Sequence, residues 1–401
     1  MAANSRLFLS DPFPSASSGE TGEAPIPLGR PELGAEELTA ISDALSRLGQ
    51  GAAPKYIGLC EETLGAVHAP ASALMTQSCT AAMELAMLML DLKPGDEVIM
   101  PSFTFTSTAN AVALRGGVPV FVDIRPDTLN IDESLIEAAI TAKTRAILPV
   151  HYAGVACEMD FVLDVARGHG LWVIEDAAQG FGASYKGRPL GSIGQLGAIS
   201  FHQTKNVVAG EGGCLLVSDP ELLDRALIGR DKGTNKVAFQ EKRVKQYTWS
   251  GLGSAYAMHE VTAAFLYAQL GKAERITARR IALWDKYDRM LRPLARAGKI
   301  QLPTVPEVCE HNGHIYYVLA RDRAARDRLM QRLNEAGVGA TFHYVPLHSS
   351  PAGIRYGRAS GSLPHTEDCA GRVLRLPLFS TLTEDQQDRI CDLLTAALEV
   401  D

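Results

Sequence analysis

Short apolar runs and amphipathic stretches alternate along most of this chain of 401 residues. Apolar side chains at helical spacing predict helices, whereas four to eight consecutive apolar residues between polar turns predict buried strands. The expected strands are 73–75, 97–100, 118–122, 145–150, 171–174 and 197–201, and the expected helices among them are 36–48, 81–90 and 131–142. This alternation predicts an α/β fold with a mostly parallel sheet between two layers of helices.

The pattern changes beyond residue 256. Two long helical stretches, 256–270 and 274–294, predict a passage into a second domain. After them we expect a strand at 315–320, a helix at 323–336, a strand at 340–344 and a closing helix at 384–398. We therefore predict a large domain at 25–275 and a smaller C-terminal α+β domain at 276–401. Residues 1–24 contain the small polar run SASSGETGEA and are expected to form a flexible N-terminal arm.

Composition and charge disfavour several classes of protein. The chain is 46% hydrophobic and 21% charged, which is typical of a globular protein with enough apolar residues for more than one core. A net charge of −7 argues against broad attraction to nucleic acids or anionic membranes. We find no signal peptide or membrane-spanning run, and the seven scattered cysteines lack metal-ligand spacing. We expect a cytoplasmic protein with no metal, nucleic-acid or membrane partner.

The most informative chemical groups lie where two predicted strands end. Asp176 follows the strand at 171–174, and Lys205 follows the strand at 197–201. Because ligands of open α/β sheets bind at the carboxyl ends of the strands, we expect both side chains to face one site. A desolvated lysine condenses with an aldehyde, and a carboxylate keeps a pyridine nitrogen protonated. The pair therefore fits pyridoxal 5'-phosphate (PLP), although each residue alone is more typical of a helix cap or a solvated loop.

A turn between a predicted strand and a predicted helix, QSCTAA at 77–82, is suited to a phosphate. Unpaired backbone N–H groups and the positive end of the helix dipole attract anions there. The simpler interpretation is that Ser78 or Thr80 only caps the helix. The run GEGG at 210–213 lacks the lysine and the spacing of a P-loop, so we interpret it as a tight turn.

Three motifs resemble those of a known family: EDAAQ at 175–179, SFHQTKN at 200–206 and GEGG at 210–213. They are similar to the nucleotide-sugar aminotransferases of the DegT/StrS type, which are fold-type I PLP enzymes with an aspartate-aminotransferase-like fold. The resemblance extends from about residue 25 to the C-terminus. It implies that Lys205 is the catalytic residue and forms a Schiff base with PLP. Members that dehydrate sugars carry histidine at that position, so Lys205 favours amino transfer.

The same resemblance assigns further cofactor-binding residues. Thr80, Ala81 and Ser200 match positions that bind the phosphate of PLP. Phe105 matches an aromatic residue that stacks on the pyridine ring, although a phenylalanine after a strand is usually a core residue. Gln179 matches the residue beside the phenolic oxygen, and its simpler role is in a turn or helix cap.

Two residues are expected to bind substrate. His343 matches a position near the sugar-nucleotide pocket, although it is equally typical of an ordinary hydrogen-bonding residue. Lys232 belongs to a basic run at 230–245. Such a run is usually a solvated face, yet a sugar nucleotide brings a diphosphate that lysine and arginine bind. Because His343 and His348 have no nearby carboxylate cluster, we expect no metal site.

Four segments are similar to one branch of the family, the dTDP-4-dehydro-6-deoxy-D-glucose 4-aminotransferases: VHYAGVACEMD, KGTNK, YTW and HYVPLHSSPAG. This likeness implies transfer of the amino group of L-glutamate to carbon 4 of that dTDP-sugar, with the new amine axial or equatorial. The products would be 2-oxoglutarate and a dTDP-4-amino-4,6-dideoxyhexose for glycan or antibiotic biosynthesis. The alternatives are another keto sugar nucleotide or a keto-cyclitol as acceptor, a sugar dehydratase, and a non-catalytic PLP-binding regulatory protein.

The resemblance also implies a homodimer with its active site at the subunit interface. One departure concerns that interface. Most members read GxNYRM where this chain reads GSAYAM at 253–258. The asparagine that reaches across the dimer to the cofactor phosphate in those members is therefore missing, and another contact must replace it.

Overall fold

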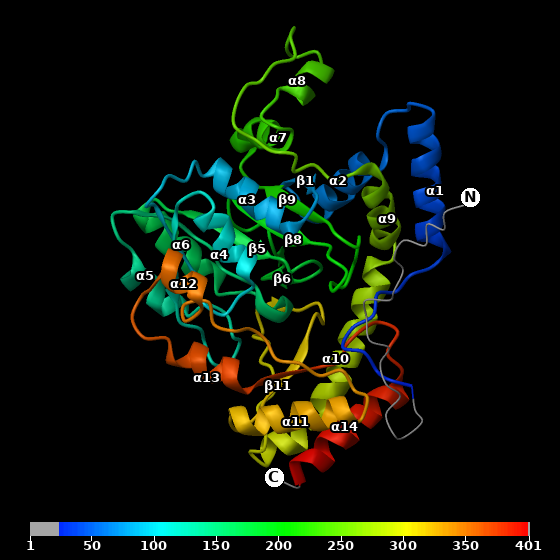
Figure 1. Cartoon of the computed structure of the whole chain (residues 1–401), viewed down its shortest axis with the longest axis vertical. Coiled ribbons are helices and arrows are strands. Elements are labelled where there is room, and N and C mark those ends of the chain that lie inside the picture. The colour runs from blue at the N-terminus through cyan, green and yellow to red at the C-terminus, as the bar shows by residue number, and fades with distance from the viewer. Residues whose placement is uncertain (1–23, 400–401) are drawn as a thin grey trace, which may run out of the picture.

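The computed structural model of the protein describes residues 24–399, so the arm expected at 1–24 lies almost wholly outside the described part (Figure 1). A sheet of eight strands forms its centre, in the order β1-β9-β8-β5-β4-β2-β3-β12. The bounds are β1 (Ser72–Thr76), β9 (Gly213–Val217), β8 (Leu196–Ser200), β5 (Trp172–Ala177), β4 (Thr144–Ile147), β2 (Glu97–Pro101), β3 (Val118–Val122) and β12 (Arg358–Ala359). Neighbours from β8 to β12 are parallel, whereas β9 is antiparallel to both β8 and β1. The predicted mostly parallel sheet is confirmed.

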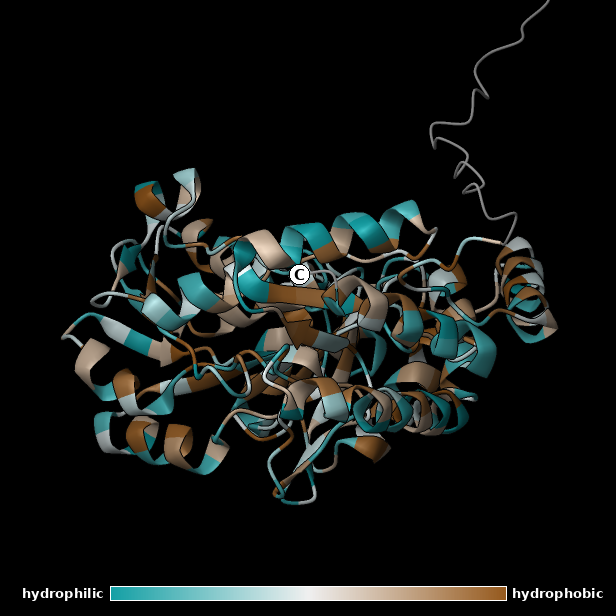
Figure 2. Ribbon diagram, turned by 90° about the horizontal axis from the view of Figure 1, so that it is seen from below, coloured by the Kyte–Doolittle hydropathy of each residue, from teal (hydrophilic) through white to brown (hydrophobic). Residues whose placement is uncertain are grey.

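Helices cover both faces of this sheet, because successive side chains of a strand point to opposite sides. In β5, Val173 packs into one apolar cluster and Ile174 into another. The cluster around Ile174 includes residues of α3 (Cys79–Met89), α4 (Thr106–Ala113) and α7 (Leu223–Arg230). The cluster around Val173 includes residues of α1 (Ala35–Gly49), α2 (Tyr56–Val67), α5 (Ile136–Ala139), α6 (Met159–His169) and α9 (Glu260–Leu270). Figure 2 shows hydrophobic strands inside the molecule and more hydrophilic colouring along the surrounding helices.

The C-terminal part has its own apolar cluster. The long helix α10 (Ala273–Arg296) runs into it from the central sheet (Figure 1). Its two-stranded antiparallel sheet places Val318 opposite Leu374, both fully buried. The elements here are β11 (Tyr316–Leu319), α11 (Arg323–Glu335), α13 (Pro364–Arg372), β13 (Val373–Leu376) and α14 (Glu384–Glu399). The domain boundary at 275/276 stays a prediction.

Smaller elements connect these parts. A three-stranded sheet joins β10 (Cys309–Glu310), β6 (Ser184–Tyr185) and β7 (Arg188–Pro189). The short helices are α8 (Lys236–Gln240) and α12 (Pro351–Tyr356), with 3-10 turns at Glu133–Leu135, Tyr152–Gly154 and Pro220–Leu222. None of the helices within residues 24–399 combines the length and the apolar character needed to span a bilayer.

Two predicted elements are wrong. The helix expected at 131–142 is reduced to a 3-10 turn and the single turn α5, because the Thr144 hydroxyl accepts a bond from the Thr141 backbone and ends it. The strand expected at 340–344 is a loop. There the side-chain amide of Asn334 bonds both the N–H and the C=O of Ala340, which removes these groups from any strand ladder.

Candidate active site

The carboxyl ends of β5 and β8 meet at one edge of the sheet, where Asp176 lies opposite Ala198 in parallel register. Asp176 is the second-last residue of β5 and is 3% exposed. Lys205 lies in the loop after β8, in a turn closed by a bond from its N–H to the His202 carbonyl (2.9 Å). The fold therefore brings together the two groups on which the sequence argument depends.

The carboxylate of Asp176 is held by neutral donors. Its Oδ2 accepts a hydrogen bond from Thr108 Oγ1 at 2.7 Å, and its Oδ1 accepts one from the Ala178 backbone at 3.1 Å. None of the ion pairs within residues 24–399 includes Asp176. A buried carboxylate is normally compensated by a cation, whereas this one has only these two neutral donors among the described residues.

The amine of Lys205 is half-buried and makes no hydrogen bond or ion pair with another described residue. Burial lowers the pKa of Lys205, while the nearby Cys79 thiol and the charge of Asp176 oppose that shift and the charge of Arg375 adds to it. The net lowering increases the fraction of neutral amine, which is the nucleophilic form.

The turn at the start of α3 is the expected phosphate site. Ser78 is the N-cap, and its Oγ accepts a bond from the Ala81 N–H at 3.1 Å, so the capping interpretation is correct for Ser78. Thr80 does not cap the helix, because its hydroxyl bonds Ser107 Oγ at 2.8 Å. A hollow of about 450 Å³ adjoins the turn, lined by Gln77, Ser78, Glu211, Ala257, Met258, His259 and Thr262.

The GEGG segment contains both a turn and a close packing contact. Gly210 has a φ of 77°, the left-handed conformation that favours glycine. A Cβ on Gly213 would lie 2.3 Å from the carbonyl carbon of Ser78, so the first residue of β9 packs directly on the turn before α3. The predicted tight turn is present at Gly210, and Gly213 additionally lets β9 approach the candidate phosphate site.

Aromatic and amide groups border the space beside Asp176. Phe105 is 58% exposed at the N-cap position of α4, so it is not a core residue. Gln179 accepts a bond from the Ala153 N–H at 2.6 Å and donates one to Tyr344 Oη at 3.0 Å. Tyr344 also faces Phe105, with ring centroids 6.5 Å apart. Ser200 is buried at the end of β8, where its Oγ accepts a bond of 3.4 Å from the His202 N–H.

The two expected substrate residues lie in different surroundings. His343 stacks on Tyr344 with ring centroids 3.9 Å apart, and it contacts Tyr152 Oη and Arg375 Nη1. Burial and the positive charges of Arg375 and Lys205 lower the pKa of His343 to about 2, so the ring is neutral. Lys232 is exposed between α7 and α8, and no described contact joins it to the residues around Asp176.

Several residues that support this site were not predicted from the sequence. Asn312 donates to the carbonyls of Gln179 and Phe181, both at 2.8 Å, and its own carbonyl accepts a bond from Asn206. The lysine loop is thereby tied to the turn that carries Gln179. The run HNGH at 311–314 was a polar signal before a strand, but spacing alone gives no sign that it lies beside the lysine loop.

Glu175 holds the other side of β5. Its carboxylate accepts bonds from the N–H groups of Gly191, Ile193 and Gly194 and from His151 Nε2 at 2.9 Å. Burial alone would raise the pKa of Glu175, but the bonds from His151 and the backbone lower it overall, so the group stays ionised. This network fixes the strand end that carries Asp176.

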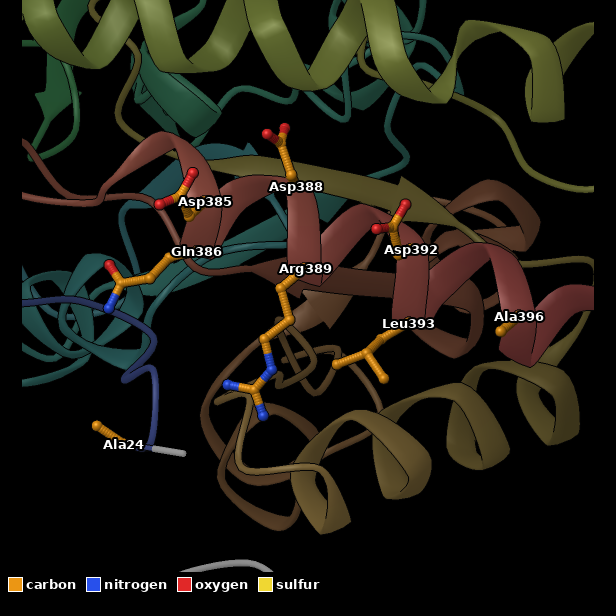
Figure 3. Close-up of a pocket in the computed structure, with 8 residues that line it drawn as sticks. All are labelled: Ala24, Asp385, Gln386, Asp388, Arg389, Asp392, Leu393 and Ala396. Carbon is orange, nitrogen blue, oxygen red and sulfur yellow. The ribbon is translucent and has the colours of Figure 1, made fainter. Parts of the chain in front are cut away.

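Other parts of the described chain lack this combination of groups. Among residues 24–399, no three His, Cys, Asp or Glu side chains gather as metal ligands. His348 instead pairs with Glu367 and bonds Ser102. Figure 3 shows a hollow of about 790 Å³ along α14, lined by Ala24, Asp385, Gln386, Asp388, Arg389, Asp392, Leu393 and Ala396. It lies in the C-terminal part, away from the strand ends that carry Asp176 and Lys205 (Figure 1).

Known proteins resemble the chain over nearly its whole length. The model of the DegT/DnrJ/EryC1/StrS aminotransferase family matches residues 31–395. The uncharacterized protein MJ1066 of Methanocaldococcus jannaschii is 34% identical over 390 residues, covering 94% of this chain and 98% of that protein. The spore coat polysaccharide biosynthesis protein SpsC of Bacillus subtilis is 33% identical over 375 residues, covering 92% of this chain and 95% of that protein. The PMP form of the putative sugar aminotransferase Spr1654 of Streptococcus pneumoniae superimposes with a TM-score of 0.86 at 27% identity. The match covers 94% of this chain and 99% of that chain.

Proposed function

This chain belongs to the DegT/DnrJ/EryC1/StrS aminotransferase family and is a PLP-dependent sugar aminotransferase, and from that premise we propose its donor and acceptor. The donor is L-glutamate, and the acceptor is carbon 4 of dTDP-4-dehydro-6-deoxy-D-glucose. The products are 2-oxoglutarate and a dTDP-4-amino-4,6-dideoxyhexose. The four segments similar to the 4-aminotransferase branch support the choice of acceptor.

One observation carries the catalytic part of the proposal. The buried carboxylate of Asp176 lies at the end of β5, and the amine of Lys205, whose pKa is lowered, lies in the loop after the neighbouring parallel strand β8. Among the described residues, neither group has an ion pair. Each lacks the partner that such a group normally has in a folded protein. A protonated pyridine ring that carries an aldehyde would provide a partner for both the carboxylate and the amine.

The residues present fit PLP. Asp176 would face the pyridine nitrogen, while Phe105 offers an exposed ring for stacking. The phosphate would lie at the start of α3, beside Thr80 and Ala81, with Ser200 at the adjacent strand end. Figure 1 shows α3 over β8 and β9, beside these strand ends. When bound, PLP withdraws electrons from the carbon that carries the transferred nitrogen.

Lys205 performs two tasks in this proposal. It first holds the cofactor through its side-chain nitrogen. Its neutral amine would also take the proton from the donor's α-carbon and hold that proton for its return. Asp176 keeps its charge beside the ring throughout, and Gln179 holds its position through the bonds to Ala153 and Tyr344.

A second subunit would complete the substrate pocket. The segment after α7 projects from the body of the molecule (Figure 1), and it carries Lys232 and the exposed side chains of Trp249 and Leu252, which are 75% and 65% exposed. We propose that this segment covers the partner subunit and brings Lys232 to the diphosphate of the substrate there. His343 would bind the sugar within its own subunit.

Incubation with L-glutamate and dTDP-4-dehydro-6-deoxy-D-glucose tests the function. We expect one 2-oxoglutarate for each nucleotide sugar aminated, and mass and NMR analysis should place the nitrogen on carbon 4. The Lys205→Ala variant should give no product and serves as the control. An amine at carbon 3, loss of water without consumption of glutamate, or a bound cofactor that glutamate leaves unchanged would each contradict the proposal.

A further inference from the structure

We propose that Arg375, on β13, binds the α-carboxylate of the amino-acid donor. This inference deepens the proposed function, because it names the residue that recognises the donor. Arg375 lies at the third position of β13, where the backbone pairs with Tyr317 of β11 and with Thr341. Its side chain reaches His343, which the sequence motif HYVPLH places beside the active site.

The half-buried side chain of Arg375 lacks the carboxylate partner that Arg230 and Arg326 have. It donates one bond, from Nη1 to His343 Nε2 at 2.9 Å, while its Nε is buried and has no partner. No ion pair within residues 24–399 includes it. By contrast, Arg230 pairs with Glu61, and Arg326 pairs with Asp327. Because a buried charge without compensation is costly, the side chain is arranged for an anion supplied from outside the chain.

Positive charge dominates the surroundings of Arg375. The nearby Arg280 is also buried and is bonded only to the carbonyls of Gly313 and His314, at 3.0 and 2.7 Å. Burial lowers the pKa of Arg375, and its charge in turn lowers the pKa of Lys205 and of Arg280. An anion bound to Arg375 would relieve this repulsion.

The contacts of Arg375 lead directly to the reacting groups. His343 stacks on Tyr344, and Tyr344 accepts the bond from Gln179, which follows β5 and Asp176. Since the guanidinium donates to His343 Nε2, the ring proton of His343 lies on Nδ1 and faces Tyr152 Oη at 3.3 Å. Arg375 therefore belongs to the same cluster as the candidate cofactor residues.

Chemistry favours an α-carboxylate over a diphosphate at this point. In an amino acid, the carboxylate is bonded to the carbon that carries the transferred nitrogen, so it must lie close to Lys205. In the proposed acceptor, the diphosphate is on carbon 1, across the sugar ring from carbon 4. A planar guanidinium also matches a carboxylate through parallel hydrogen bonds. An arginine that acts electrostatically on Lys205 thus suits the donor carboxylate.

The reaction has two halves, one with the amino-acid donor and one with the sugar nucleotide. Measured separately, they distinguish binding of the donor carboxylate by Arg375 from binding of the diphosphate. Arg375→Gln keeps a side-chain N–H group for His343 but removes the charge, and we expect it to lower kcat/KM for L-glutamate by about 10- to 100-fold. Binding of α-methyl-L-glutamate, which has the carboxylate but no α-proton to lose, should weaken by the same factor. Affinity for dTDP and the rate with the sugar nucleotide should change by less than about threefold. Arg375→Lys should restore part of the glutamate affinity.

Arg372→Ala is the matched control. Arg372 is three residues away, and its guanidinium is satisfied by the Ala320 carbonyl, Asp368 and Gln301. Its loss should lower Tm and leave both half-reactions unchanged. Equal losses in both half-reactions of Arg375→Gln, a selective loss of dTDP affinity, or no loss at all would overturn the inference. If the wild type reacts with another amino acid but not with glutamate, only the proposed donor fails, and the same variants then test Arg375 with that amino acid.

Discussion

At the scale of single residues, the proposed catalytic role of Lys205 implies a cost in stability. Burial and the charge of Arg375 favour its neutral form, which suits a nucleophile but makes the ammonium costly in the folded protein. No carboxylate bonds the amine in the described structure, and the charge of Asp176 offsets only part of this cost before the cofactor binds. The same feature predicts both reactivity and a pH-dependent stability.

We expect Lys205→Met to stabilise the cofactor-free protein at about pH 7. The folded-state pKa of Lys205 lies below that of the unfolded chain, about 10.4. Between these two values the unfolded state binds more protons, so the stability of the wild type rises with pH. The advantage of Lys205→Met should therefore shrink as the pH approaches about 10. Urea unfolding of both proteins from about pH 7 to about pH 10 measures this difference in stability. A difference that grew with pH would contradict the lowered pKa of Lys205.

The hydroxyl of Thr108 is the second residue-scale test. It donates to Asp176 Oδ2 at 2.7 Å, and hydrogen bonds to carboxylate groups contribute about 1.5–3 kcal/mol. Thr108→Val should therefore raise the dissociation constant of PLP by about tenfold or more. Thr104→Val is the control, because within residues 24–399 the Thr104 hydroxyl bonds Thr108 and not Asp176. Equal PLP affinity in Thr108→Val and the wild type would show that Asp176 does not face the cofactor.

At the scale of elements, close packing of β9 on the start of α3 shapes the phosphate turn. Gly213→Ala would place a Cβ 2.3 Å from the Ser78 carbonyl carbon, so the turn must move. We expect a loss of about 1–3 kcal/mol in the free energy of unfolding, together with weaker PLP binding. In Gly168→Ala, in α6, the added Cβ meets no atom within 4 Å and should stabilise the protein by about 0.5–1 kcal/mol. Calorimetry and PLP titration measure both effects, and unchanged PLP affinity in Gly213→Ala would contradict this role.

The elements also show what the sequence could predict. Strong periodicity located α1 and α14 to within a residue or two, and apolar runs located β3 and β8. The helix at 131–142 and the strand at 340–344 were wrong because polar side chains took over backbone hydrogen bonds, which hydrophobic patterns do not report.

The site was predicted unevenly for a related reason. Asp176 and Lys205 follow apolar strands, so their positions at one sheet edge follow from parallel topology. The contact of Arg375 with His343 and that of Asn312 with Gln179 join elements that only the folded chain brings together. No spacing rule indicates such contacts.

At the scale of the whole molecule, the projecting segment after α7 predicts a dimer. Trp249, Tyr247 and Leu252 are exposed on this segment, and large apolar side chains grouped in this way are typical of interfaces. We expect a dimer in sedimentation velocity at micromolar concentration. Trp249→Ala should raise the dissociation constant of the dimer by about 30-fold, and activity should fall as the dimer dissociates. Phe161→Ala, at an exposed position on α6, is the control and should leave the dimer intact. A monomeric wild type with full activity would contradict this arrangement.

The central claim is that Lys205 is the residue that holds PLP. Reduction of the holoenzyme with sodium borohydride makes the lysine link permanent, and proteolysis with mass spectrometry then locates it. We expect the added cofactor mass on the peptide that contains Lys205, and we expect none there after the donor amino acid has converted the enzyme. Attachment to any other lysine, or no attachment to a protein that contains bound PLP, would contradict it.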